Sequence, residues 1–336
     1  MVHSEHNNST MVLSDLAIGY YEHIPVVEHI ESIVGHGEMI ALVGRNGSGK
    51  STLIKTLAGL LDPLSGGYSI NDQSFDKLSV EQRAKTISYV SATDIQVPNL
   101  TVFELVSLGR YPYTNWLGGL SAYDREIIHS VLNWVSMTGY ENKSFYQLSD
   151  GEKQRVMIAR ALAQDTPLIL FDEPTAFLDL SNKFELIQLL DNLKRRNKTI
   201  IFSTHDLETA WLWADKFWVI HEKRLLDGSP EDLGLSGVYN HLFEGTDLYF
   251  NVESQRFEVE KPMIQKVYLK PGKDDAFRWT KRAFDRTGIK LVPKHETSIE
   301  VTIIEQDGKH FWKVRQFADV QLFNNLYNLV NYLILS

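Results

Sequence analysis

A glycine-rich stretch between an apolar run and a helical pattern has residues suited to binding phosphate. It reads GRNGSGKS and matches the spacing G-x-x-x-x-G-K-[ST] from Gly44 to Ser51. Glycines allow the loop to turn several N–H groups towards phosphate oxygens, and the helix that follows adds its positive N-terminal end. We expect Lys50 to contact the β- and γ-phosphates and the Ser51 hydroxyl to ligate Mg²⁺. The predicted nucleotide-binding residues of this loop are Gly44, Arg45, Asn46, Gly47, Ser48, Gly49, Lys50, Ser51 and Thr52.

Two adjacent carboxylates follow a second apolar run. Residues 168–171 predict a strand buried on both faces, and Asp172 and Glu173 come directly after it. Because neighbouring side chains on a strand point to opposite faces, the two carboxylates cannot have the same role. We expect Asp172 to hold Mg²⁺, directly or through water, and Glu173 to be the base for an attacking water. Acidic residues often simply end a strand, but here Pro174 stops the strand and a phosphate loop lies upstream.

A third apolar run, residues 199–202, is followed by His205 and then by a helical pattern. A single histidine is more often structural than catalytic. At the end of a parallel strand, in a chain with a phosphate loop, we expect its imidazole to contact the γ-phosphate and help hold the water. The three groups require parallel strands whose carboxyl ends meet at one edge of a sheet, which predicts an α/β fold.

The composition is that of an ordinary globular protein. The chain has 336 residues, of which 43% are hydrophobic and 23% charged. No uninterrupted apolar run reaches the roughly 18–20 residues of a membrane helix, and the polar N-terminus does not resemble a secretory signal. The absence of cysteine excludes disulfides and cysteine-ligated metals. The net charge of −9 argues against nucleic acid as a partner, which requires a basic surface.

The charge is distributed unevenly along the chain. Residues 263–336 hold 12 Lys and Arg against 8 Asp and Glu, whereas residues 1–262 hold 22 against 35. This change predicts two domains, 10–262 and 263–336. In the second, alternating apolar residues predict strands, Asp307-Gly308 predicts a hairpin turn, and a final helix carries an apolar stripe. The predicted stripe contains Phe323, Leu326, Tyr327, Val330, Leu333 and Ile334.

We therefore expect residues 263–336 to form a small α+β domain with two helices on an antiparallel sheet. Its use stays open between a regulatory or ligand-sensing module and a cap that holds two copies together. No catalytic group of residues is evident in it, which favours packing or dimerisation.

The stretch YQLSDGEKQRVMIARAL begins with turn and cap residues and becomes helical after Ser149. Its centre, LSDGEKQR, resembles the LSGGQ-type signature of ATP-binding-cassette (ABC) ATPases. GRNGSGKS, LILFDEP, FLD and STHD occur with it in the order typical of that family. The resemblance implies a P-loop NTPase fold with a mixed sheet, and a helical subdomain at about residues 98–160. It also implies that the residues around Gly151 bind the γ-phosphate of an ATP held by a second copy, and that Asp179 lies between the two sites. The implied contacts to that ATP are Ser149, Gly151 and Glu152.

Residues 99–124 resemble the importer ATPases for iron–siderophore, haem and cobalamin complexes within this family. In that subgroup the corresponding run precedes the helical subdomain that contacts a membrane permease. The aromatic side chains of this region stay open between an ordinary core and a permease contact. They are Phe103, Tyr111, Tyr113 and Trp116.

The chain departs from the family pattern at several positions. Ala92 stands where members usually carry a glutamine that contacts Mg²⁺, and Asp94 or Gln96 is the candidate replacement. Asp150 replaces a glycine of the signature, and we expect its carboxylate to turn away from phosphate. Family spacing implies that Tyr21, with Tyr20 as its neighbour, stacks on adenine, and the alternative for either tyrosine is an ordinary strand residue.

These features together imply an ATPase subunit that binds ATP and Mg²⁺ and drives import of metal chelates. Its implied partners are a second copy of the chain, a permease dimer and, indirectly, a periplasmic or surface substrate-binding protein. It would lie peripherally at the cytoplasmic face of the inner (plasma) membrane. The alternative is a soluble ABC ATPase of translation or DNA repair. A single phosphate loop and the lack of a heptad run disfavour it.

Overall fold

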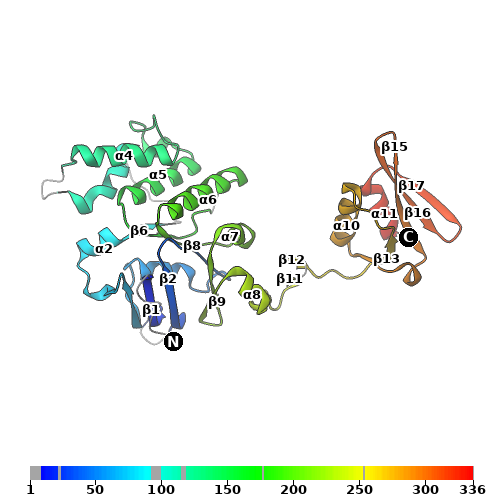
Figure 1. Ribbon diagram of the computed structural model, residues 1–336, viewed down its shortest axis with the longest axis horizontal. Helices are drawn as coiled ribbons and strands as arrows, with labels where there is room; N and C mark the ends of the chain where they lie inside the picture. The colour runs from blue at the N-terminus through cyan, green and yellow to red at the C-terminus, as the bar shows by residue number, and fades with distance from the viewer. Residues whose placement is uncertain are drawn as a thin grey trace. The chain divides into compact units, whose positions relative to one another are not determined.

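The structure is a computed structural model that describes residues 9–21, 24–91, 100–114, 119–175, 178–252 and 254–335 (Figure 1). The chain forms two compact units, Met1–Leu242 and Phe243–Ser336. The second unit begins with a hairpin of β11 (Leu248–Asn251) and β12 (Arg256–Val259). The predicted division at residue 263 therefore falls within the second unit, after this hairpin.

A six-stranded sheet forms the centre of the first unit. Its strands, in spatial order, are β10 (Arg224–Gly228), β9 (Lys216–His221), β3 (Met39–Gly44), β8 (Thr199–Ser203), β7 (Leu168–Phe171) and β6 (Ile87–Val90). All neighbours are parallel except β10, which pairs antiparallel with β9. β7 and β8 are buried along their whole lengths, as expected for apolar strands covered on both faces. The residues that follow β3, β7 and β8 consequently meet at one edge of the sheet.

A second, antiparallel sheet packs in the same unit. Its strands, in spatial order, are β2 (Val27–Gly35), β1 (Ser9–Ile18), β4 (Ser65–Ile70) and β5 (Gln73–Ser74). Helix α1 (Lys50–Leu57) contributes Leu53 and Ile54 to a buried core that also contains Met11 of this sheet and Leu42 of β3. This shared core fixes the start of α1 beside the end of β3.

The helical segments described between residues 102 and 163 pack around one long helix, α5. They are α3 (Val102–Ser107), η3 (Leu108–Tyr113), α4 (Ala122–Trp134), η4 (Phe145–Gln147) and α5 (Asp150–Ala163). A buried ion pair joins Arg110 Nε to Asp124 Oδ1 at 2.8 Å. Arg110 Nη1 also donates to the carbonyl oxygen of Ala163 at 2.8 Å. One guanidinium therefore ties η3, α4 and the end of α5 together.

The other helices of the first unit flank the sheets, and Figure 1 shows α6 drawn next to α5. They are η2 (Phe75–Lys77), α2 (Val80–Thr86), α6 (Leu180–Arg195), α7 (Leu207–Trp213), α8 (Pro230–Leu235) and α9 (Val238–Leu242). Within the described ranges, none of the helices is long and apolar enough to cross a membrane.

The second unit contains a five-stranded sheet with helices packed on one face. In spatial order the strands are β14 (Ile289–Leu291), β13 (Gln265–Leu269), β15 (Ile299–Gln306), β16 (Lys309–Gln316) and β17 (Asp319–Phe323). β13 pairs parallel with both β14 and β15, so the predicted antiparallel sheet is wrong in this half. The reason is α10 (Asp275–Thr287), which connects β13 to β14 as a crossover and returns the chain in the same direction. The predicted turn at Asp307-Gly308 is confirmed, because it joins the antiparallel strands β15 and β16.

The last helix, α11 (Leu326–Leu335), follows the short η5 (Lys294–Glu296) and β17 along the chain. It buries Leu329, Val330 and Leu333 in the core of the second unit, while Tyr327 and Ile334 are exposed. The predicted stripe is therefore wrong at the two exposed positions, and Phe323 belongs to β17 and not to this helix. The face towards the core contains Leu326, Leu329, Val330 and Leu333. Tyr327 and Ile334 each follow a residue of this face by one position, so they lie at the side of the helix.

Candidate functional site

The glycine-rich loop connects β3 to α1 and carries a buried lysine. Lys50, only 5% exposed, donates from Nζ to the carbonyl oxygens of Gly44 at 2.9 Å and Arg45 at 3.3 Å. Burial lowers the pKa of the Lys50 ammonium, and the carboxylates of Glu173 and Asp172 partly oppose this shift. The amine is held inside the loop, at the position where phosphate oxygens would compete with the carbonyls for its protons.

The loop has the features of a phosphate cradle. Gly49 adopts φ 110°, and a Cβ there would lie 2.7 Å from Val26 Cγ1, so only glycine fits. The N-terminus of α1 has no side-chain cap. Ser48 Oγ is buried and, among the described residues, has no hydrogen-bond partner. Uncapped helix N–H groups and an unpaired buried hydroxyl are donors for an anion, so these residues fit a nucleotide phosphate.

A set of oxygen atoms lies beside the loop. Ser51 Oγ donates to Asp172 Oδ1 at 2.9 Å, and Ser203 Oγ donates to the same oxygen at 2.8 Å. Hydroxyl and carboxylate oxygens are the ligands that Mg²⁺ prefers, so Ser51 and Asp172 fit the predicted ion. No sequence motif identifies Ser203 as a site residue. Its position at the end of β8, next to the end of β7, is the signal that identifies it.

Glu173 and His205 are brought together at the same edge. Glu173 Oε1 lies 2.5 Å from His205 Nε2, and Lys50 Nζ lies 3.5 Å from His205 Nδ1. Glu173 has a left-handed backbone, φ 51°, and its N–H donates to Ser203 Oγ at 2.8 Å. A non-glycine residue in this region is strained, and such strain is often found at functional sites. The three residues predicted from separate motifs therefore form one cluster.

The two tyrosines expected near the adenine differ in their contacts. Thr52 Oγ1 donates to Tyr20 OH at 3.3 Å, which places Tyr20 beside the start of α1. Tyr21 is more exposed and forms a backbone bridge with Ile24. Both rings are accessible for stacking, and the hydroxyl contact favours Tyr20 as the one fixed next to the loop.

The signature stretch forms the N-terminus of α5. Ser149 is the N-cap: its hydroxyl accepts from the Glu152 N–H, and its own N–H donates to Glu152 Oε2 at 2.8 Å. This hydrogen bond is the largest cause that lowers the pKa of Glu152. The Asp150 side chain is exposed and lies 3.4 Å from Lys153 of the same helix. Ser149 and Glu152 therefore satisfy each other's hydrogen-bonding groups within one chain.

Contacts link the signature helix to α6. Arg155 Nη2 donates to Asn182 Oδ1 at 2.9 Å and forms an ion pair with Glu185. Asp179 is the N-cap of α6, because its Oδ1 accepts from the Asn182 N–H at 2.8 Å. This bond is also the main reason that the pKa of Asp179 is lowered. A cavity of about 380 Å³ lies between α5 and α6, with Gly151, Gln154 and Asn182 in its wall.

Several predicted residues lie outside the described ranges. Asp94 is among residues 92–99, together with Ala92 and Gln96. Trp116 also lies outside these ranges. Among the other aromatic residues of the helical region, Tyr113 packs against Arg110, with 4.0 Å between the ring centroid and Arg110 Cζ. Tyr111, by contrast, is exposed. Tyr113 thus packs within the subdomain, and Tyr111 is available for a contact.

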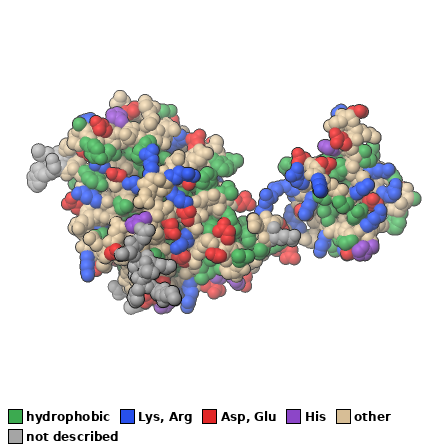
Figure 2. All heavy atoms as spheres, viewed as in Figure 1, with side chains coloured by type: hydrophobic (Ala, Val, Ile, Leu, Met, Phe, Trp, Pro, Cys, Tyr) green, Lys and Arg blue, Asp and Glu red, His purple; other side chains and the backbone are tan. Residues whose placement is uncertain are grey.

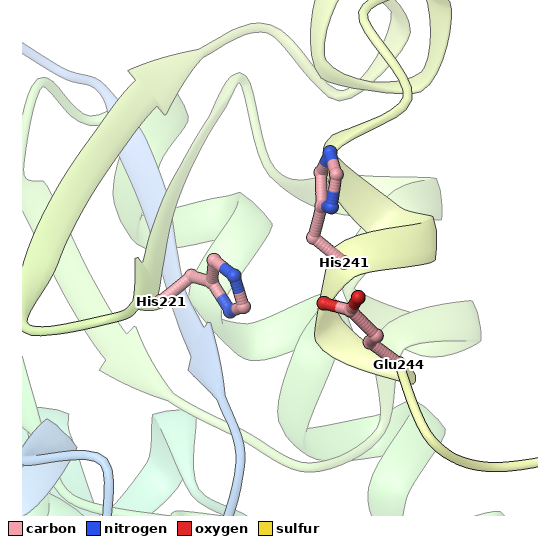
Figure 3. Close-up of side chains that lie close together, drawn as sticks. All are labelled: His221, His241 and Glu244. Atoms are coloured by element: carbon pink, nitrogen blue, oxygen red, sulfur yellow. The ribbon is translucent and has the colours of Figure 1, made fainter.

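Figure 3 shows a pair of histidines, of which His221 directly follows Ile220, the β9 residue that pairs with Gly44 of the phosphate loop. His221 ends β9 and His241 is on α9, and their rings stack with centroids 5.8 Å apart.

Two family models match the chain. One, described as ABC transporter, matches residues 27–176, and the other, described as iron ABC transporter C-terminal domain, matches residues 265–334. The chain is 35% identical over 253 residues to an ABC transporter ATP-binding protein of Methanocaldococcus jannaschii, covering 75% of this chain and 87% of that protein. It is 38% identical over 203 residues to the iron(3+)-hydroxamate import ATP-binding protein of Bacillus subtilis, covering 60% and 75% of the two chains.

Solved structures agree with these matches. An inward-facing metal-chelate type ABC transporter has a chain 26% identical, with a TM-score of 0.59 over 67% of this chain and 85% of that chain. A dimeric ATP-binding cassette in a post-hydrolysis state, bound to ADP and Pi, is 26% identical. Its TM-score is 0.58 over 65% of this chain and 98% of that chain.

Proposed function

The chain belongs to the family of ABC transporter ATP-binding proteins, and on this premise we propose that it drives an importer of iron–siderophore, haem or cobalamin-type metal chelates. The predicted P-loop NTPase fold and the predicted ATPase activity are confirmed by the same matches. The protein binds and hydrolyses ATP as the energy-coupling subunit of a transporter. The soluble translation or DNA-repair alternative is not favoured, because both named relatives are transporter proteins and one of them is named for import.

The main support for the substrate class is that two separate parts of the chain both resemble proteins of iron transport. The ATPase part is similar to a protein named for iron(3+)-hydroxamate import. The C-terminal part matches a domain described from iron ABC transporters. Iron–siderophore complexes are therefore favoured over haem and cobalamin within the proposed class.

The cluster at the sheet edge supports the following division of roles. Lys50 and the loop N–H groups bind the phosphates, and Ser51 and Asp172 hold Mg²⁺, which supplies charge neutralisation on the phosphate oxygens. Glu173 accepts the proton of the attacking water at its carboxylate. His205, 2.5 Å from Glu173 Oε1, keeps that carboxylate oriented. Asp94 stays a candidate Mg²⁺ ligand, and Tyr21 or Tyr20 a candidate adenine platform.

The signature residues belong to the second half of each site. Ser149, Gly151 and Glu152 stand at the start of α5, and the structure of a related cassette dimer bound to ADP and Pi supports a pairing of two chains. In such a dimer each helix start serves the ATP of the other copy, and Asp179 lies between the sites.

The remaining partners follow from the import role. The helical region, with the exposed Tyr111, is the proposed contact with a permease dimer. That permease receives substrate from a periplasmic or surface binding protein. The chain then lies peripherally at the cytoplasmic face of the inner (plasma) membrane.

Purification of the tagged chain from detergent-solubilised native membranes, followed by mass spectrometry, tests this proposal. We expect a polytopic permease in stoichiometric amount, whose binding protein is then titrated with ferric siderophores, haem and cobalamin. A chain recovered only in the soluble fraction, alone or with ribosomes or DNA, would overturn the import role.

A further inference from the structure

The two edges of the five-stranded sheet differ in how they are protected against pairing. One edge, β14, is three residues long, carries Lys290 and is followed by Pro293. Short length, lysine and proline are features that prevent an edge strand from adding another strand. The other edge, β17, has none of them. It reads DVQLF and pairs with β16 in unbroken register from Asp319 to Phe323.

The exposed side chains of β17 are apolar on one face. Val320 and Leu322 pair with Arg315 and Lys313 of β16, on the face of the sheet away from α10 and α11. They are 49% and 59% exposed, and Phe317, just before the strand, is 83% exposed. Figure 2 shows hydrophobic side chains among charged ones on the surface of this unit. An unprotected edge with adjacent apolar side chains is the feature that recruits a further strand.

We propose that β17 pairs antiparallel with β17 of a second copy of this chain, which joins the two C-terminal sheets into one. The two-fold axis passes through Gln321, so that Val320 faces Leu322 of the partner subunit and Leu322 faces Val320 of the partner subunit. This register uses all five residues and places apolar groups opposite one another on the open face.

The position of the Asp319 carboxylates favours the same strand register. In this register Asp319 faces Phe323 of the partner subunit, and the two Asp319 carboxylates lie at opposite ends of the paired strands. A register centred on Asp319 would place two carboxylates directly opposite each other, which is destabilising. A strand that is complementary to itself forms a closed two-fold dimer, so the occupant is a second copy rather than a different protein.

A related ATP-binding cassette forms a dimer, and such a dimer would bring two copies of this chain together. Two copies that share ATP sites in one transporter have a high effective concentration for each other, which adds to the strength of a short strand pair. The inference does not depend on the transported substrate.

Cysteine cross-linking measures the contact directly, because the chain contains no cysteine. Opposed Cα atoms in an antiparallel pair lie about 4.5–5.5 Å apart, within the range of about 4.4–6.8 Å that a disulfide spans. We expect full-length Gln321→Cys, oxidised mildly without nucleotide, to form a covalent dimer on a non-reducing gel. Lys290→Cys on the protected edge is the matched control and should remain monomeric. Equal cross-linking of the two variants, or none at position 321, would overturn the proposal.

Register is tested with two further variants. Val320→Cys alone should not cross-link, because its two copies would lie about 8 Å apart. A mixture of Val320→Cys and Leu322→Cys should cross-link as a heterodimer. Self-cross-linking of Val320→Cys at the rate of Gln321→Cys would overturn the assigned axis.

A substitution that leaves the fold intact completes the test. Leu322→Lys changes an exposed side chain, so circular dichroism should not change. In sedimentation without nucleotide, the dissociation constant of the dimer should rise by about tenfold, because two apolar cross-strand pairs are lost. ATPase activity should persist, so failure of this inference and failure of the import role give different results. An unchanged dimer constant in this variant would also contradict the proposed contact.

Discussion

Two helix starts of the first unit differ in whether a side chain occupies their free N–H groups. α1 follows Gly49 without a side-chain cap, whereas α5 is closed by reciprocal hydrogen bonds between Ser149 and Glu152. Helix N-termini attract anions, and an acidic side chain at the same place occupies the donors that an anion would use. α1 is therefore ready for phosphate, while α5 is masked by its own carboxylate.

The difference has a consequence for the proposed ATP dimer. A γ-phosphate at α5 would compete with the Glu152 carboxylate, which accepts hydrogen bonds from the N–H and the hydroxyl of Ser149, and like charges repel. The capping box must open for the second half of the site to form. One half of each composite site is thus preformed, and the other half is available only after a local rearrangement at Ser149.

The largest effect is expected from a substitution that tests whether ATP hydrolysis depends on the preformed half of the site, next to α1. Glu173→Gln removes the proposed base and keeps the side-chain shape, so ATPase activity should fall about 10²–10⁴-fold. Gel filtration of the variant with MgATP should show a stable dimer, because ATP is bound but not hydrolysed. Steady-state phosphate release measures the first effect.

Glu222→Gln is the matched control for this substitution. Glu222 also has a left-handed backbone, φ 45°, but lies in the turn between β9 and β10. Its ATPase rate should equal that of the unmodified chain. A Glu173→Gln variant that hydrolyses ATP normally would remove Glu173 from the proposed mechanism.

A second capping box sharpens the comparison, since it has a structural role. Ser121 and Asp124 cap α4 as Ser149 and Glu152 cap α5, but Asp124 also pairs with the buried Arg110. Asp124→Asn leaves that guanidinium buried without its counter-charge. The free energy of unfolding should fall by about 3–5 kcal/mol, measured by urea titration.

The pH dependence of stability identifies the same carboxylate. The Ser121 hydroxyl and then Arg110 hold the pKa of Asp124 below its ordinary value, against the effect of burial. A lowered pKa in the folded state contributes stability above the unfolded pKa of about 3.9, and this is lost as the pH falls through the lowered value. The stability difference between the unmodified chain and Asp124→Asn should therefore shrink on acidification. A constant difference down to acid pH would show that the pair does not act through charge.

The sequence predicts those parts of the site that are contiguous. The loop from Gly44 to Ser51 and the pair Asp172-Glu173 contain their chemistry within a few residues, so spacing alone identifies them. Ser203 was overlooked because its role arises from the pairing of β7 with β8, which brings its hydroxyl to Asp172 and Glu173. Contacts between strands distant in the sequence leave no local pattern.

The same limit explains the errors in the second unit. Alternation identified the strands of residues 299–316, and Asp307-Gly308 identified their turn. Parallel pairing of β13 depends on where α10 returns the chain, which periodicity does not encode. The face of α11 was misjudged at Tyr327 because a helix with many apolar residues admits neighbouring stripes.

The smallest effect separates the cap of α5 from its proposed role in binding ATP. Ser149→Ala and Ser79→Ala each remove an N-cap serine from a complete capping box, on α5 and on α2. Each should lower the free energy of unfolding by about 1 kcal/mol, because the helix loses the same kind of hydrogen bond. Only Ser149→Ala should also reduce ATPase activity, by about tenfold, since a hydrogen bond to a charged phosphate is lost in addition. Urea titration and phosphate release on both variants distinguish the two roles: equal loss of stability with equal ATPase rates would make Ser149 a helix cap alone, and α5 would then have no part in binding the nucleotide through that residue.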